Sequence, residues 1–373
     1  MTQSPGSRLS AVDMNWRGRI RESIVLVLQA ALEAYGARLG DEELAAMTGV
    51  AFMFTCASDV PDPYRWPRFG KHAFLEPAAR AYGLSLRPLH PPEAAPLPVT
   101  PPEFAAHFQD SYLPFIKDAI RRDEPVLAWM GWPRPYEEDW GIIIAFDEAT
   151  NRCFGFPPAC IPPPPLEGAP VQVYLVQDYV PAGPSTKERL ALVLGRAALI
   201  LNNRLDPSYG VTTGPQAMLS WRDFVKERLA SGAPGDLEEV VIATRRLATM
   251  LSLNRRAAIH VLQRYRDDAS PEQGRLIDGA IPLFEATVAE LHKYYPERDL
   301  PSRTEIAHIA HLLSRPTDPT TANVVSVPEA GSPQMQLQSE PGRRRLLELL
   351  DRLVDLECQA ALLFRIEENP VAP

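Results

Sequence analysis

The chain has 373 residues, of which 45% are hydrophobic and 23% are charged, values typical of a soluble globular protein with room for two domains. Its formal net charge of −9 argues against broad electrostatic binding of nucleic acid, and its longest apolar runs, such as IVLVLQAAL, are too short to cross a membrane. No apolar segment precedes a small-residue cleavage site, and the four cysteines lack CxxC spacing, so we expect a reduced, cytoplasmic protein without a signal peptide.

The front of the chain is expected to be helical. After a flexible arm at 1–17, helical periodicity runs from Ile20 to Tyr35 and stops at Gly36, a residue that often ends helices. Asp41 is expected to cap a short helix with acidic residues in its first turn. Two more helices are expected, one ended by Gly83 and one in the segment PPEFAAHFQDSYLPFIKDAIRRD.

Strand signals begin only after these helices. Apolar and β-branched runs predict strands at 125–131, 141–147, 152–156 and 171–177. Helices followed by a β-meander indicate an α+β domain, with boundaries at 18–180, rather than an alternating α/β fold.

The rear of the chain carries helical periodicity only. Helices are expected at 186–203, 214–230, 236–251, 254–267, 272–295 and 302–314. These form an all-helical domain over 184–315, followed by a linker rich in Pro, Ser, Thr and Gln at 316–341. A final amphipathic helix at 342–367 is expected to dock back on this domain or to form a homodimer with a second subunit.

The front domain resembles the papain-like, C39-type peptidase fold over residues 20–177. The features that carry this resemblance are the segment RESIVLVLQAALEAYG, the helix DEELAAMTG, the strand DEPVLAWMG and the apolar hairpin that follows it. Peptidases of this group often begin the first helix with Cys-Gly-Pro, at a fixed spacing before a Tyr-Gly pair. Counting back from Gly36 by that spacing arrives at Ser23.

The other two catalytic positions of such peptidases are also changed. Their histidine precedes an aromatic residue and an apolar strand, where this chain has Asp139 in the segment DWGIIIAFD. Their orienting Asp ends the return strand, where this chain has Pro157 in GFPP. Since the mechanism needs a thiolate, an imidazole and a group that orients it, the resemblance implies the fold without standard peptidase chemistry.

A narrower resemblance is to bacterial two-domain proteins with a C39-like front half and a helical rear half. It is carried by MTGVAFMF, by YEEDWGIIIAFD and by TTGPQAMLSWRDFV. The butirosin-pathway acyltransferase type, which forms an amide from a carrier-protein thioester, is a more distant relative of similar layout.

A ligand slot is expected where these degenerate positions meet. The N-terminal end of the first helix carries partial positive charge, the carboxylates of YEEDW would face it, and tryptophans would form a wall. The residues expected to contact a ligand are Ser23, Glu137, Glu138, Asp139, Trp132 and Trp140. Such a slot would favour a zwitterionic or amide-bearing small molecule or peptide.

Two alternatives remain open. Cys56, with His72 as its base, could serve an acyltransferase or amide hydrolase, although a half-buried structural cysteine is the commoner role. A protein-binding adaptor would rest on the helical domain and its last helix. Cys153 and Cys160 are expected to be packing residues.

No metal or cofactor is expected. Glu305, His308 and His311 share one face of a predicted helix, but no fourth ligand motif accompanies them, so a solvated face is favoured. Nucleotide-binding and nucleophile-elbow motifs are lacking in the sequence. The leading hypothesis rests on the changed residues Ser23, Asp139 and Pro157: a non-peptidase C39-like protein whose degenerate catalytic cleft binds a small molecule or peptide.

Overall fold

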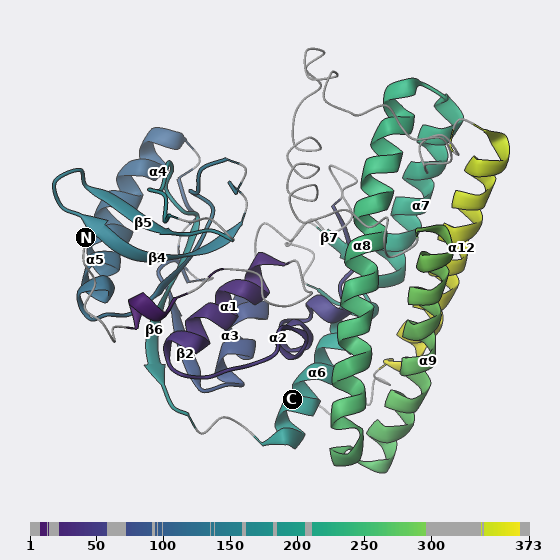
Figure 1. The fold of residues 1–373 in the computed structure, drawn as a ribbon, viewed down its shortest axis with the longest axis horizontal. Helices are drawn as coiled ribbons and strands as arrows, with labels where there is room; N and C mark the ends of the chain where they lie inside the picture. The colour runs from purple at the N-terminus through teal and green to yellow at the C-terminus, as the bar shows by residue number, and fades with distance from the viewer. Residues whose placement is uncertain are drawn as a thin grey trace. The chain divides into compact units, whose positions relative to one another are not determined.

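The fold is described from a computed structural model of the chain, which divides into two compact units (Figure 1). The first unit comprises Met1–Val50 and Gly70–Arg189, and the second comprises Ala51–Phe69 and Leu190–Pro373. The residues described are 8–12, 14, 22–57, 72–91, 94, 96–98, 100–134, 136–137, 139–158, 162–181, 185–205, 211–295, 337 and 339–365.

The first unit contains a five-stranded antiparallel sheet. Its strands are β2 (Leu84–Pro88), β3 (Val126–Trp129), β4 (Trp140–Asp147), β5 (Arg152–Phe156) and β6 (Gln172–Tyr179). They lie in the order β2-β6-β3-β4-β5. The four predicted strands are confirmed, but the expected meander covers only β3, β4 and β5, because β6 returns to pair with β3 and with the unpredicted edge strand β2.

Helices of the first unit pack on the sheet or on one another. They are α1 (Ser23–Ala34), α2 (Asp41–Thr48), α3 (His72–Arg80), α4 (Pro101–His107), the π-helical turn η3 (Phe108–Tyr112) and α5 (Leu113–Arg121). The side chains of Val126, Ile143 and Val173 share one apolar cluster with α5. Because side chains alternate along a strand, Ile142 faces the other side of the sheet, where α1 packs on β4.

Part of the expected flexible arm is docked on the first unit. The Asp123 carboxylate accepts hydrogen bonds from the backbone amides of Arg8 at 2.6 Å and Leu9 at 3.2 Å. The side chains of Leu9, Val12 and Met14 are buried. This part of the arm therefore contributes to the fold instead of extending freely.

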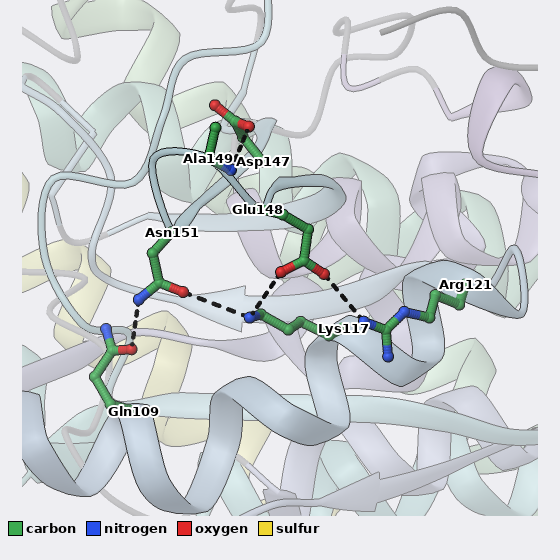
Figure 2. A network of polar contacts seen from close by, with 7 residues as sticks. All are labelled: Gln109, Lys117, Arg121, Asp147, Glu148, Ala149 and Asn151. Carbon is green, nitrogen blue, oxygen red and sulfur yellow. Dashed lines mark hydrogen bonds and ion pairs between the residues drawn. The ribbon is translucent and has the colours of Figure 1, made fainter.

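The turn between β4 and β5 is tied to α5 by the polar network in Figure 2. Lys117 Nζ lies 3.3 Å from Glu148 Oε2 and 3.4 Å from Asn151 Oδ1. Arg121 donates to the same Glu148 carboxylate at 3.0 Å, and Asn151 donates to Gln109 at 3.0 Å. These groups are exposed, so the network stabilises the hairpin modestly.

The second unit is mainly helical, as predicted. Its helices include α6 (Thr186–Leu201), α7 (Gly214–Ser231), α8 (Pro234–Tyr265), α9 (Pro271–Tyr294) and α12 (Glu340–Leu363). The two helices expected at 236–251 and 254–267 are one helix, α8, because no Gly or Pro interrupts the chain between them. The helix expected at 302–314 and most of the linker lie outside the described residues.

A short two-stranded sheet in the second unit was not predicted. β1 (Thr55–Ala57) pairs antiparallel with β7 (Val211–Thr213), and Phe54 O accepts the amide of Gly214 at 3.0 Å. The segment 51–69, expected to belong to the front domain, therefore belongs with the helical unit. Three residues are too few to show period-two alternation, so the sequence signal was absent.

The C-terminal helix α12 docks within its own unit. It lies beside α7 and α9 (Figure 1). Its apolar side chains, including Leu346, Leu350 and Leu353, are buried in the same cluster as Trp221. Because this face is covered by the chain itself, it is not available to pair with a second subunit. Among the described residues, no helix combines the length and apolarity needed to span a membrane.

Candidate functional site

Ser23 begins α1 and contacts the start of β4. Glu22 has extended backbone geometry and precedes the first helical residue. The Ser23 hydroxyl accepts a hydrogen bond from the backbone amide of Trp140 at 3.1 Å. Two of the expected site positions, Ser23 and the strand start at 139–141, are therefore brought together across more than a hundred residues of sequence.

Asp139 lies in the loop between β3 and β4, where its backbone forms two hydrogen bonds. Its carbonyl accepts from Met130 N at 3.2 Å, and its amide donates to Tyr136 O at 3.0 Å. Met130 adopts a left-handed φ of 69°, a conformation that is strained for a residue with a side chain. The Asp139 side chain is partly exposed. The connection is thus a structured loop that presents a carboxylate near the start of β4.

Pro157 follows β5 directly and is buried. On the paired strands, Phe156 is the partner of Ile142, so extending the antiparallel register by one residue places Pro157 beside Gly141. The positions Ser23, Asp139 and Pro157 thus surround one end of β4. None of the three side chains is a thiol or an imidazole.

The acidic residues of this loop have different surroundings. Glu137 forms an ion pair with Arg134 at 2.9 Å, and both side chains are exposed. Surface pairs of this kind contribute little to stability, so Glu137 remains accessible to solvent. Glu138 lies outside the described residues.

The two tryptophans expected to form a ligand wall are core residues. Trp132 and Trp140 are each 2% exposed. The Trp132 indole donates to Ala128 O at 3.4 Å and lies over Gly141, while Trp140 contacts the Tyr174 ring with centroids 5.9 Å apart. Their flat rings are used to pack the two faces of the sheet, so neither is presented at the surface.

The alternative thiol, Cys56, is only 3% exposed and belongs to the apolar cluster of the helical unit. It lies on β1 opposite Thr212. The side chain of His72 is outside the described residues, so the pairing of Cys56 with His72 stays a prediction. Cys153 is also buried, and burial raises the pKa of its thiol to about 12, which makes it a poor nucleophile. Cys160 lies outside the described residues.

Three residues were considered from the sequence as possible metal ligands. They lie outside the described residues: Glu305, His308 and His311. Within the part of the chain that the structure describes, no group of three or more His, Cys, Asp or Glu side chains is arranged to hold a metal ion.

The sequence analysis did not predict the cluster of polar side chains at η3. At η3, Ser111 Oγ lies 3.4 Å from His107 Nδ1, and the His107 and Tyr112 ring centroids are 5.1 Å apart. The only signal was Pro114 inside an otherwise regular helical pattern. Proline removes one helix hydrogen bond but does not reveal which side chains the altered turn brings together.

Comparison with known proteins adds no family to this geometry. No protein-family model matches the sequence, and no curated protein shows significant similarity to it. The resemblance to the C39-type fold therefore rests on the residues quoted above and on the arrangement of Ser23, Asp139 and Pro157.

Proposed function

We propose that this protein is a non-catalytic relative of the papain-like, C39-type fold that binds a small molecule or peptide beside the start of β4. The observation that carries the proposal is the hydrogen bond from the Trp140 amide to the Ser23 hydroxyl. It joins the beginning of the first helix to the beginning of the strand, as a papain-like site requires. The α+β fold with a helical second unit is consistent with this reading.

The chemistry of the three positions supports binding over catalysis. A serine needs a base within hydrogen-bond reach to become a useful nucleophile. The Ser23 oxygen accepts a backbone amide, and the position of the peptidase histidine holds Asp139, a carboxylate that is a poor base for a hydroxyl. A proline at 157 has no side-chain group that could orient a base. The accessible carboxylates Glu137 and Asp139 suit the amino or amide nitrogen of a ligand, because charge-assisted hydrogen bonds are the stronger ones.

The decisive experiment restores the lost dyad. In Ser23→Cys/Asp139→His, an imidazolium beside the introduced thiol would lower the thiol's pKa and raise its thiolate fraction. We expect its alkylation by iodoacetamide at pH 6 to be at least about tenfold faster than in Ser23→Cys alone, the change given by a pKa lowered by about one unit. Mass spectrometry of the peptide containing position 23 separates this rate from those of the four native cysteines.

The matched control is Ser23→Cys/Glu137→His, which places the histidine on an exposed position of the same loop. It is expected to leave the alkylation rate at the level of Ser23→Cys. Equal rates in both double variants would contradict the papain-like assignment. Ligand preference is then measured by disulfide capture of fragments at position 23 of Ser23→Cys, where amide and zwitterionic fragments should exceed hydrocarbon ones. Capture without such a preference would contradict the binding proposal while leaving the fold assignment intact.

A further inference from the structure

The π-helical turn η3 changes the hydrogen-bond pattern between α4 and α5. Pro114 has no amide hydrogen to donate to the carbonyl of Asp110, as a regular α-helix would require at this point. The five residues Phe108–Tyr112 form a wider turn instead. Such turns frequently occur at functional sites, because they redirect side chains out of the regular helical rows.

Two ring side chains meet at this turn. The rings of His107 and Tyr112 are 5.1 Å apart and nearly perpendicular, with an angle of 74°. Ser111 Oγ lies 3.4 Å from His107 Nδ1. When the serine hydroxyl donates to Nδ1, the neutral imidazole carries its proton on Nε2, which makes Nε2–H a hydrogen-bond donor.

Two polar atoms at this turn have no hydrogen-bond partner among the described residues. His107 Nε2 and the Tyr112 hydroxyl are shielded from solvent, and neither has a hydrogen-bond partner among the residues that the structure describes. Tyr112 is 0% exposed, and burial raises the pKa of its phenol to about 12. A buried polar atom without a partner is less favourable than a satisfied one, so two of them on neighbouring rings require an explanation.

The surroundings favour a neutral ligand over a charged one. Tyr112 belongs to an apolar cluster that includes Phe108, Leu113 and Ile116. Burial and then the neighbouring His107 lower the pKa of His90, which favours its uncharged form. A carboxylate buried here would lose its hydration without a compensating charge from these groups, whereas a carbonyl oxygen would not.

We propose that η3 is a binding site for the carbonyl oxygen of a neutral amide, held by the Tyr112 hydroxyl and by Nε2–H of His107. One carbonyl oxygen has two lone pairs and can accept both hydrogen bonds. The carbon skeleton of the amide would contact the apolar residues of the cluster. The site goes beyond the function proposed above, because it uses none of Ser23, Asp139 or Pro157.

The test uses the full chain and N-methylacetamide as the probe. Nuclear magnetic resonance of protein labelled at histidine nitrogen and tyrosine carbon should show His107 protonated at Nε2. Its resonance and that of Tyr112 should shift in a saturable way, with a dissociation constant of about 1–10 mM, a range reasonable for a ligand this small. The opposite tautomer, or shifts that rise linearly without saturation as they would with water alone at the turn, would overturn the proposal.

Variants provide the matched comparison. Tyr112→Phe removes one donor and should weaken binding about tenfold, and His107→Leu should do the same. His107→Gln keeps an amide donor at the corresponding position and should bind more tightly than His107→Leu. Tyr179→Phe removes a tyrosine hydroxyl from β6 and should leave the dissociation constant unchanged. Equal binding by wild type and Tyr112→Phe would overturn the assignment.

Discussion

Two regions of the molecule, one in each unit, show how buried charged and buried neutral polar groups are treated differently. In the helical unit, Arg255 and Glu357 are both 0% exposed and form a bidentate ion pair at 2.9 and 2.7 Å. The remaining guanidinium nitrogen of Arg255 donates to Ala51 O at 2.8 Å. In the α+β unit, by contrast, His107 Nε2 and the Tyr112 hydroxyl are buried without partners among the described residues.

The difference follows from the size of the desolvation penalty. A buried unpaired charge is so unfavourable that the fold must supply its partner, whereas an unpaired neutral group is tolerated at a few kcal/mol. The helical unit obeys the same rule, because both side-chain polar atoms of Asn254 also lack partners among the described residues. Asn254 supplies both a donor and an acceptor, which water can satisfy. At η3 the proposed ligand would instead supply one carbonyl oxygen, which can accept from both Nε2–H of His107 and the Tyr112 hydroxyl.

The largest expected effect comes from breaking the charged pair. Arg255→Leu leaves the Glu357 carboxylate buried without its partner, and the free energy of unfolding should fall by about 3–5 kcal/mol. Urea unfolding followed by far-ultraviolet circular dichroism measures the change. The double variant Arg255→Met/Glu357→Leu removes both charges and should recover most of the loss. If Arg255→Leu lowered the free energy of unfolding by less than about 1 kcal/mol, as expected for an exposed pair, the pair would not be desolvated.

A smaller effect is expected from steric crowding in the α+β unit. A Cβ atom at Gly141 would lie 2.5 Å from the buried Trp132 ring and 2.7 Å from Phe156 O, so Gly141→Ala should lower the free energy of unfolding by about 1–3 kcal/mol. The matched control is Gly195→Ala in α6, where a Cβ atom would meet nothing within 4 Å. That variant should be stabilised by about 0.5–1 kcal/mol. Similar changes at both glycines in thermal unfolding would contradict the packing of Trp132.

Much of the fold could be predicted because its signals are local. The strand at 152–156 matches β5, and the short helix predicted at Asp41 is α2, although its N-cap residue is Gly40 and not Asp41. Long-range pairing could not be predicted, because β1 and β7 are short and lie in distant parts of the sequence. The joining of 236–251 and 254–267 into α8 was not predicted, although no Gly or Pro separates the two segments.

The site was predictable only in part. The position of Ser23 beside the start of β4 was predicted from the spacing in the C39-type peptidases that the sequence resembles. The burial of Trp132 and Trp140 did not, since an aromatic residue next to a loop can face either the core or solvent. The contact of His107 with Tyr112 depends on a π-helical turn, and helical periodicity alone does not signal its side-chain geometry.

The smallest expected effect on stability concerns the buried Tyr112 hydroxyl. In ligand-free protein, Tyr112→Phe removes a buried hydroxyl that has no acceptor among the described residues, so the free energy of unfolding should change by less than about 0.5 kcal/mol or rise. Ser23→Ala provides the contrast within the same unit. It removes the acceptor of the Trp140 amide and should lower the free energy of unfolding by about 1 kcal/mol. Both changes are measured by urea unfolding at neutral pH. If Tyr112→Phe were the more destabilising of the two, the hydroxyl would already have a partner in the free protein, and η3 would lack the unfilled donor on which carbonyl binding depends.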